Sequence, residues 1–396
     1  DRKRLTSQLI TEATLLALWA VKTLFGVKVS QVPSLLPGLL AAALLAWLSV
    51  WLSEFIGVSL MGFEKTPISA VMVAIVLGLV TGNLVPLPTA LKPGFTFSVK
   101  KVLRLGIILL GIRLSIFDVV RLSALGVPIV MLCIVSALFF TTRLNKWLRL
   151  PERLGTLIAV GTAICGVTAI VAAGPAIDAE DEEVAYAVAV ITTFGILATL
   201  LYPYAAHLMC TGDAVRAGLF MGTAIHDTSQ VTGAALVYAD VFAAPRALDA
   251  ATVTKLVRNV FMAAVIPLMA FYYARRMQNQ GEFVGKKTNV TKLLPLFIVG
   301  FLALAVVRSV GDAGVNAGGQ AFGLWDAVTW TSIHQFVKTW AVNFLVVALA
   351  GVGLSTSFRM IKGLGIKPFI VGMGAALMVG VVSFFTICLL GTLVPL

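Results

Sequence analysis

The stretch GTAICGVTAIVAAGPAI, from Gly161 to Ile177, decides how the chain folds. It is apolar enough to lie in a membrane, yet it carries three glycines, two threonines, a cysteine and a proline, and glycine and proline both weaken a helix. An unpaired backbone group is costly in lipid, so a weakened helix persists only where neighbouring protein or a water-filled cavity satisfies its backbone. The stretch therefore predicts a helix that breaks between Gly161 and Gly166. The alternative is an unbroken helix whose small residues pack closely against another helix.

A break at this point would leave the N-terminus of a half-helix near the middle of the membrane. Such an end carries a partial positive charge and free N–H donors, which together favour an anion. We expect the Cys165 and Gly166 amides to face a polar cavity there.

The composition places the break in a membrane. The chain has 396 residues, of which 59% are hydrophobic and 12% charged, and its mean hydropathy is +0.99, whereas soluble domains carry about a quarter charged residues. We expect an all-α polytopic membrane protein with one transmembrane domain over residues 31–396. Its four cysteines lack the CxxC spacing of a metal site, and we expect no metal or cofactor. About eleven apolar windows are long enough to span a bilayer, at residues 37–57, 67–85, 95–118, 124–142, 155–177, 184–208, 214–238, 252–276, 293–308, 335–354 and 366–394.

The net charge of +12 indicates topology rather than binding to nucleic acid. Basic residues gather in three loops that fall on one side of this span count: Arg143, Lys146, Arg149 and Arg153; Arg275, Arg276, Lys286, Lys287 and Lys292; and Arg359, Lys362 and Lys367. By the positive-inside rule these loops are cytoplasmic, which predicts that the acidic run DAEDEE, Asp178 to Glu183, and the C-terminus lie outside.

Residues 1–30 are helical in pattern but contain Glu12 and Lys22. Their basic start belongs inside, and if the span at residue 37 also starts inside, they cannot cross the membrane once. We therefore expect an amphipathic helix at the cytoplasmic interface. No small-residue cleavage site follows an apolar region, which argues against a signal peptide.

Two internal matches suggest repeats, and one duplication cannot produce both. The segments from Gly111 and from Gly351 match at an offset of 240, in helices that the span count directs oppositely, as inverted-topology repeats require. The tetrapeptide GTAI occurs at Gly161 and again at Gly222. We favour the first match because it is longer, and a match of four small residues arises easily by chance. It predicts inverted repeats, and we expect a homodimer.

A second stretch, MGTAIHDTSQVTGAALVY from Met221 to Tyr238, places His226 and Asp227 halfway along an apolar span. Ionisable residues at that depth are usually functional. On a continuous helix His226, Ser229 and Gln230 would share one face with Gly233. We expect His226, beside Asp227, to couple transport to protons. Sodium coupling through Asp227, Gln230 and backbone carbonyls is the alternative, and a buried polar pair that only fixes helix packing is another.

Five further residues are candidate anion ligands. Arg113 lies deep in its span, whereas Arg104 is nearer the cytoplasmic edge, where its side chain could instead snorkel to the headgroups. Lys255, Arg258 and Asn259 share one helix face near the outer end of another span, where snorkelling is again the alternative.

The motifs LRLGIILLGIRLS, GTAICGVTAIVAAGPAI, FGILATLLYP and GTAIHDTSQV resemble the bacterial sulfate exporter family of YeiH-like inner-membrane proteins, and the resemblance runs from about residue 37 to the C-terminus. It implies a secondary carrier of sulfate or a related small anion, with inverted repeats and broken helices, in the inner membrane and in contact with lipid. His226 with Asp227 and Cys165 with Gly166 match the family's conserved pairs and are assigned to ion coupling and substrate binding, respectively. The full set of expected substrate ligands is Arg104, Arg113, Thr162, Ala163, Cys165, Gly166, Thr168, Gln230, Lys255, Arg258 and Asn259.

Two other classes of protein stay open. An anion channel would need the same cationic pathway. A membrane enzyme could use Cys165 as nucleophile and His226 as base, although no known catalytic signature surrounds them.

Overall fold

A computed structural model describes residues 29–62, 66, 68–278, 295–357 and 366–393. The amphipathic helix expected at residues 1–30 lies outside the described residues, except for its last two. Within the described chain, seven helices are long and apolar enough to cross a membrane, which confirms an all-α polytopic membrane protein. The total number of spans stays a prediction, apart from the two windows that are corrected below. The only strands described are β1 (Gln320–Ala321) and β2 (Trp325–Asp326), which form a small antiparallel hairpin.

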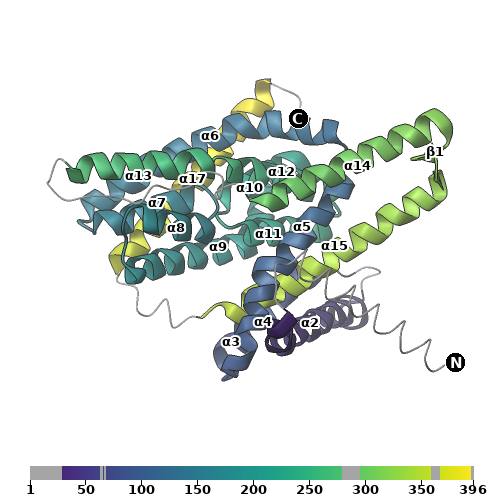
Figure 1. The fold of residues 1–396 in the computed structure, drawn as a ribbon, viewed down its shortest axis with the longest axis horizontal. Coiled ribbons are helices and arrows are strands. Elements are labelled where there is room, and N and C mark those ends of the chain that lie inside the picture. Colours follow the sequence, from purple (N-terminus) through teal and green to yellow (C-terminus); the bar gives the residue numbers. More distant parts are fainter. Residues whose placement is uncertain (1–28, 63–65, 67, 279–294, 358–365, 394–396) are drawn as a thin grey trace.

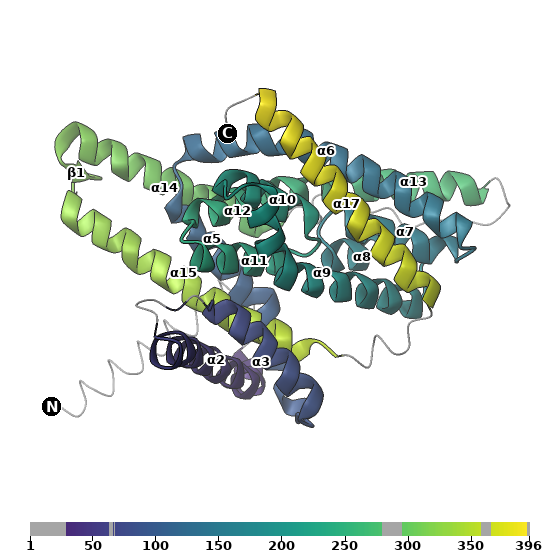
Figure 2. The same ribbon diagram turned by 180° about the vertical axis from the view of Figure 1, so that it is seen from behind.

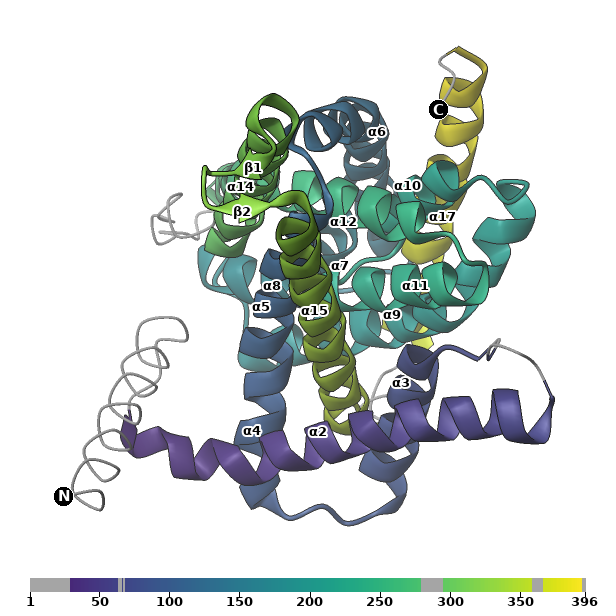
Figure 3. The ribbon, with the colours of Figure 1, turned by 90° about the vertical axis from the view of Figure 1, so that its right-hand side faces the viewer.

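The helices form two bodies, which we call the frame and the core (Figures 1 and 2). The frame contains α2 (Val32–Glu54), α3 (Ala70–Leu84), α4 (Lys92–Phe97), α5 (Leu103–Leu110), α14 (Leu296–Gly318) and α15 (Ala327–Ser355). A π-helical turn, Ser98–Val102, joins α4 to α5, and the 3-10 turn Gly111–Arg113 follows. Figure 3 shows α2 running across α4 and α15 at a steep angle.

The core contains α6 (Ile116–Trp147), α7 (Glu152–Ala163), α8 (Val167–Ala173), α9 (Asp181–Met209), α10 (Ala214–Ala224), α11 (Thr228–Val241), α12 (Pro245–Val260), α13 (Met262–Gln278) and α17 (Ile366–Leu393). The frame touches the core mainly where α3 and α15 lie against α11 and where α14 lies against α6.

Glycines allow the frame helices to cross closely. A Cβ atom on Gly353 of α15 would lie 2.6 Å from the Ile75 carbonyl oxygen and 2.9 Å from the Gly78 Cα of α3. Both distances are too short for a side chain. The two backbones therefore touch, as they do where small residues line membrane helix crossings.

Capping residues fix where several core helices begin. Ser115 and Asp118 form a capping box at the start of α6, and Glu180 and Glu183 form one at the start of α9. Asp213 accepts hydrogen bonds from the backbone N–H groups of the first turn of α10. These short polar signals interrupt the apolar sequence and satisfy donors that a helix start leaves free.

The first broken segment, α7 and α8, folds back on itself as a re-entrant hairpin. Arg153, at the start of α7, forms an ion pair with Glu180, which follows α8, at 4.0 Å. A straight helix from residue 152 to 176 would instead be about 37 Å long. We call this segment hairpin 1, and its tip is the loop Ile164–Gly166.

The segment α10 and α11 makes a second re-entrant hairpin, hairpin 2, with its tip at Ile225–Asp227. The His207 ring, which precedes α10, stacks on the Phe242 ring, which follows α11, at 3.8 Å between centroids. The 29-residue helix α9 separates the two hairpins and is about 43 Å long at 1.5 Å per residue. The hairpins therefore start at opposite ends of the core and point inward (Figures 1 and 2).

This arrangement corrects three predictions. The windows 155–177 and 214–238 are not single crossings, because both fold back. His226 and Ser229 do not share the face of a continuous helix, because the helix breaks between them. The acidic run does not lie opposite the basic loop that contains Arg153, because Glu180 is paired with Arg153. The error arose because a glycine break was counted as part of a straight span.

The GTAI match proves to be structural. Gly161–Ile164 ends the first arm of hairpin 1, and Gly222–Ile225 ends the first arm of hairpin 2. The short match that we attributed to chance therefore marks equivalent places in the two hairpins. The repeat at an offset of 240 stays a prediction.

Candidate functional site

The two hairpin tips meet inside the core. Gly166 has a φ of 67°, and a Cβ atom added to it would lie 3.3 Å from both the Cα and the Cβ of Asp227. Gly166 therefore supplies a backbone conformation that other residues rarely adopt, together with room for the opposite tip. The predicted break between Gly161 and Gly166 is confirmed, at the end of that range.

Arg258 of α12 holds the ends of both first arms. Its Nε donates to the Ala163 carbonyl at 2.8 Å, and its Nη1 donates to the Thr223 carbonyl at 2.5 Å and the Ile225 carbonyl at 3.3 Å. Its Nη2 donates to the Thr162 carbonyl. The side chain is fully buried, so one guanidinium joins hairpin 1 to hairpin 2.

Lys255, one turn earlier on α12, also binds carbonyl groups of both hairpins, at positions nearer the tips. Its Nζ donates to the Ile164 carbonyl at 2.9 Å and the Ile225 carbonyl at 3.1 Å, and also to the His226 carbonyl. Helix C-termini leave carbonyls without partners and carry a partial negative charge. The two buried cations satisfy those carbonyls and balance that charge.

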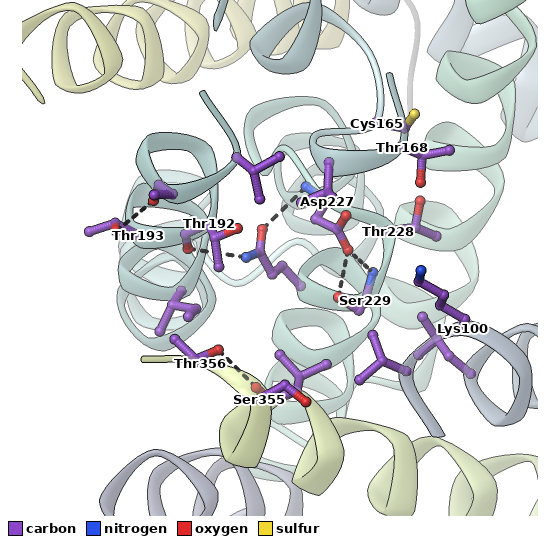
Figure 4. A pocket seen from close by; sticks show the side chains of 18 of the residues that line it. Lys100, Cys165, Thr168, Thr192, Thr193, Asp227, Thr228, Ser229, Ser355 and Thr356 are labelled. Carbon is purple, nitrogen blue, oxygen red and sulfur yellow. Dashed lines mark hydrogen bonds between the residues drawn. The ribbon is translucent and has the colours of Figure 1, made fainter. Parts of the chain in front are cut away.

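A cavity of about 610 Å³ lies beside the tips. The tips contribute Cys165 and Asp227, and the helix starts that follow them contribute Thr168 and Thr228. The lining also includes the start of α14, the end of α15 and Phe369 of α17. The frame and the core therefore each supply part of the wall. Figure 4 shows hydroxyl groups from several elements turned into this space.

Asp227 caps the start of α11 from inside the cavity. Its Oδ1 accepts hydrogen bonds from the Ser229 backbone N–H at 2.8 Å and from the Ser229 hydroxyl at 2.5 Å. Its own N–H donates to Gln230 Oε1 at 3.2 Å, and Gln230 Nε2 donates to the Thr192 carbonyl of α9 at 3.3 Å. The tip of hairpin 2 is thus tied to α9.

Cationic side chains line the frame wall. Lys100 and Arg104 lie four residues apart on the α4–α5 segment and both line the cavity. The Arg104 guanidinium lies 5.8 Å from the centroid of the Phe297 ring. With Asp227 ionised, these three groups give the lining a charge of +1, and the helix N-terminus at Thr228 adds a partial positive charge.

The family model described as "Conserved hypothetical protein 698" matches residues 37–372. The chain belongs to this family. A UPF0324 membrane protein of Corynebacterium glutamicum is 32% identical over 329 residues, which cover 82% of this chain and 85% of the relative. UPF0324 membrane proteins of Clostridium tetani, 30% identical over 82% of this chain and 90% of the relative, and of Fusobacterium nucleatum, 29% identical over 78% and 87%, are also similar. No solved structure matches the chain.

Membership of this UPF0324-like family is consistent with the resemblance to YeiH-like proteins that the motifs carry. The matched range contains both hairpins, Lys255, Arg258 and every residue that lines the cavity. The site is therefore built from the shared part of the chain.

For this UPF0324 family member, the structure divides the expected ligands into three groups. Those that line the cavity are Arg104, Cys165, Thr168, Asp227, Gln230 and Asn259. Those that lie in or behind the hairpin tips without lining it are Thr162, Ala163, Gly166, His226, Lys255 and Arg258. Arg113 is remote from it. Lys255 and Arg258 do not snorkel, because both are completely buried on backbone carbonyls.

His226 does not share the cavity, contrary to prediction. The residue is 1% exposed, and its Nδ1 has no hydrogen-bond partner among the described residues. It lies in the tip of hairpin 2, next to Asp227, which does line the cavity. The continuous helix assumed from the sequence would have turned His226 toward the same space as Ser229 and Gln230, which do line the cavity.

Several cavity residues were missed in the sequence. Lys100 could have been predicted from the sequence, because it precedes Arg104 by about one helical turn and therefore shares its helix face. The hydroxyl residues have none, because a serine or threonine in an apolar helix usually bonds to its own backbone. They are Thr192, Thr193, Thr228, Ser355, Thr356 and Ser357.

Arg113 binds protein rather than the cavity. Its Nε lies 2.7 Å from Asp249 Oδ1, and its Nη2 donates to the Pro245 carbonyl at 3.2 Å. It ends the turn after α5 and ties the frame to the start of α12. Its depth was misjudged because the predicted span ran past the true end of the helix, into the start of α6.

Replacing Arg113 with glutamine is expected to leave anion binding unchanged and to lower stability by about 1–3 kcal/mol, because the mostly buried Asp249 carboxylate loses its charged partner. Anion-induced thermal stabilisation of Arg113→Gln, measured beside the native protein, checks this. A tenfold loss of anion affinity would show that Arg113 belongs to the site.

Proposed function

We propose that the protein is a secondary active carrier of a small inorganic or organic anion, with sulfate and related sulfur oxyanions as the first candidates. The observation that carries the proposal is the meeting of two re-entrant hairpin tips beside a cavity with a net positive lining. Re-entrant backbone at membrane depth is tolerated only where protein or a water-filled cavity satisfies it, and carriers place their binding sites at such breaks.

The electrostatics support an anion rather than a cation. Lys100, Arg104 and the N-terminus of α11 face the cavity, whereas the negative C-terminal ends of the first arms are turned away, onto Lys255 and Arg258. The site thus presents the positive ends of its broken helices and covers the negative ones.

A carrier fits the geometry better than a channel or an enzyme. The tips and the buried cations close the cavity on one side, and an open pore would need a passage between them. The Cys165 thiol contacts the Met262 sulfur at 3.6 Å, which is not a general base. By the positive-inside rule, we expect the part of the α4–α5 segment that carries Lys100 and Lys101 to face the cytoplasm of a bacterial inner membrane. The predicted homodimer stays a prediction.

Proton coupling is our proposal for the energy source. Protonation of Asp227 or of the adjacent His226 would add one positive charge at the tip and strengthen anion binding, and bound anion would in turn favour protonation. Sodium coupling is disfavoured because the Ile164, Ile225 and His226 carbonyls, which could have bound a hard cation, already accept from Lys255.

In proteoliposomes, an inward proton gradient is expected to drive anion uptake by the native protein, while a sodium gradient is expected to drive none. Asp227→Asn should equilibrate the anion without responding to the gradient, and His226→Gln should respond at least tenfold less than the native protein. Asp118→Asn, which alters a helix cap outside the cavity, serves as control. Uptake driven by sodium, or an unchanged proton response in both tip variants, would rule out proton coupling at the tip.

A further inference from the structure

We infer that the transported anion is an organic monoanion: an anionic head such as a sulfonate or carboxylate, carried on an apolar body of several carbons. The inference rests on the proposed carrier function. Within the anions named there, it places organic monoanions ahead of sulfate. It follows from the two-sided chemistry of the cavity.

Three donors from three elements converge at one end of the cavity. Figure 4 shows the Lys100 side chain reaching from the frame toward Thr228 at the start of α11, beside Thr168 near the start of α8. Asn259 lies behind Thr228, and its Nδ2 donates to the Thr228 hydroxyl at 3.2 Å, which leaves that hydroxyl's own proton free to donate. An ammonium group, two hydroxyls and a helix N-terminus suit one anionic head group.

Asn259 gives independent support for a ligand at this end. It is 2% exposed, it lines the cavity, and its Oδ1 has no partner among the described residues. Buried polar side-chain atoms usually have a partner. Because Oδ1 is an acceptor, it would be satisfied by a water molecule bound with the head group at Thr228, not by the anionic head group itself.

Most of the remaining wall is apolar, although hydroxyl and amide side chains also line it: Thr192, Thr193, Ser229, Gln230, Ser355, Thr356 and Ser357. Among the described residues, the lining carries no charge beyond the three groups already named. The apolar side chains come from both bodies of the protein: Val99, Leu103, Ile107, Val167, Val188, Ala189, Ile196, Leu197, Pro295, Phe297, Val352 and Phe369. A bare oxyanion gains nothing from such walls. Each methylene group that they remove from water is expected to strengthen binding about fourfold.

Size and charge lead to the same class. A cavity of about 610 Å³ falls within the range of about 300–1,000 Å³ that is typical of sites for organic ligands. With Asp227 ionised, the described lining carries a charge of +1, which matches a monoanion. Transfer into this largely apolar space would cost a strongly hydrated dianion such as sulfate more than a monoanion.

Thermal stabilisation of the full-length purified protein by methanesulfonate, butanesulfonate, hexanesulfonate, sulfate and uncharged hexanol tests the inference. We expect affinity to rise about fourfold per methylene up to hexanesulfonate, with sulfate at least tenfold weaker than hexanesulfonate and no stabilisation by hexanol. Sulfate binding as tightly as hexanesulfonate would overturn the inference and leave the carrier proposal standing. Stabilisation by none of the anions would overturn both.

Matched variants separate the head-group site from the walls. Lys100→Met is expected to weaken every anion at least tenfold, whereas Lys101→Met, which changes the neighbouring lysine outside the cavity, should weaken none. Val188→Thr, a nearly isosteric change in the wall, should reduce the gain from butanesulfonate to hexanesulfonate and leave methanesulfonate unchanged. Equal effects of Lys100→Met and Lys101→Met, or an unchanged gain in Val188→Thr, would refute the assigned site.

Discussion

Arg258→Met is expected to yield a protein that is barely folded or that aggregates on extraction from the membrane. The variant keeps an apolar side chain of similar length but removes the guanidinium donors to the Thr162, Ala163 and Thr223 carbonyls, while the Ile225 carbonyl keeps its bond from Lys255. A buried polar group that loses its partner costs about 1–3 kcal/mol, so the loss of these bonds together exceeds the effect of most single substitutions. The fraction that stays monodisperse after heating measures the loss.

Two comparisons make this expectation specific. Arg308→Met removes another arginine, one that pairs with Asp312 on α14 and is partly exposed, and it should lower stability only slightly. Arg258→Lys keeps the charge but offers fewer donors in a different geometry, and it should fall between the native protein and Arg258→Met. If Arg258→Met were as stable as Arg308→Met, the hairpins would not depend on the guanidinium.

Gly166→Ala is expected to abolish transport while the protein still folds. The added methyl group would press on the Asp227 backbone at 3.3 Å, in a conformation with φ of 67° and ψ of −124° that costs a non-glycine residue about 1–3 kcal/mol. We expect the tips to separate or shift and anion uptake to fall at least tenfold.

Gly319→Ala is the matched control for Gly166→Ala. Gly319 also has a positive φ, of 75°, but nothing lies within 4 Å of its added Cβ atom. Both variants therefore carry backbone strain, and only Gly166→Ala disturbs the opposite tip. Equal uptake in the two variants would show that contact between the tips is not needed for transport.

The sequence revealed the first break, but neither the second break, at Ile225–Asp227, nor the path of the chain. Glycine density between Gly161 and Gly166 predicted a weakened helix, and the structure breaks there. Whether the chain then continues across the membrane or turns back depends on the tip conformation and on partners such as Arg153 and Glu180, which pair across the base of hairpin 1. A straight span and a re-entrant hairpin of the same length have similar hydropathy.

The partners of the buried cations could not be predicted either. The spacing of Lys255, Arg258 and Asn259 correctly placed them on one helix face. Every residue has a backbone carbonyl, however, so the sequence does not show which carbonyls need a partner. It therefore could not distinguish cations that bind helix ends from cations that bind substrate. The buried cations come close to the segments that begin at Gly222 and at Gly161 only after the hairpins fold toward α12.

The division of the cavity between frame and core has a consequence for the proposed carrier. Lys100 belongs to the frame, and Thr168 and Thr228 belong to the core, so an anion bound to all three would contact both bodies. Sliding one body past the other by a single helical turn, about 5.4 Å, would pull the head group away from half of its donors. The affinity for the anion would then depend on the relative position of the frame and the core, and the protein would need no separate gate to release it.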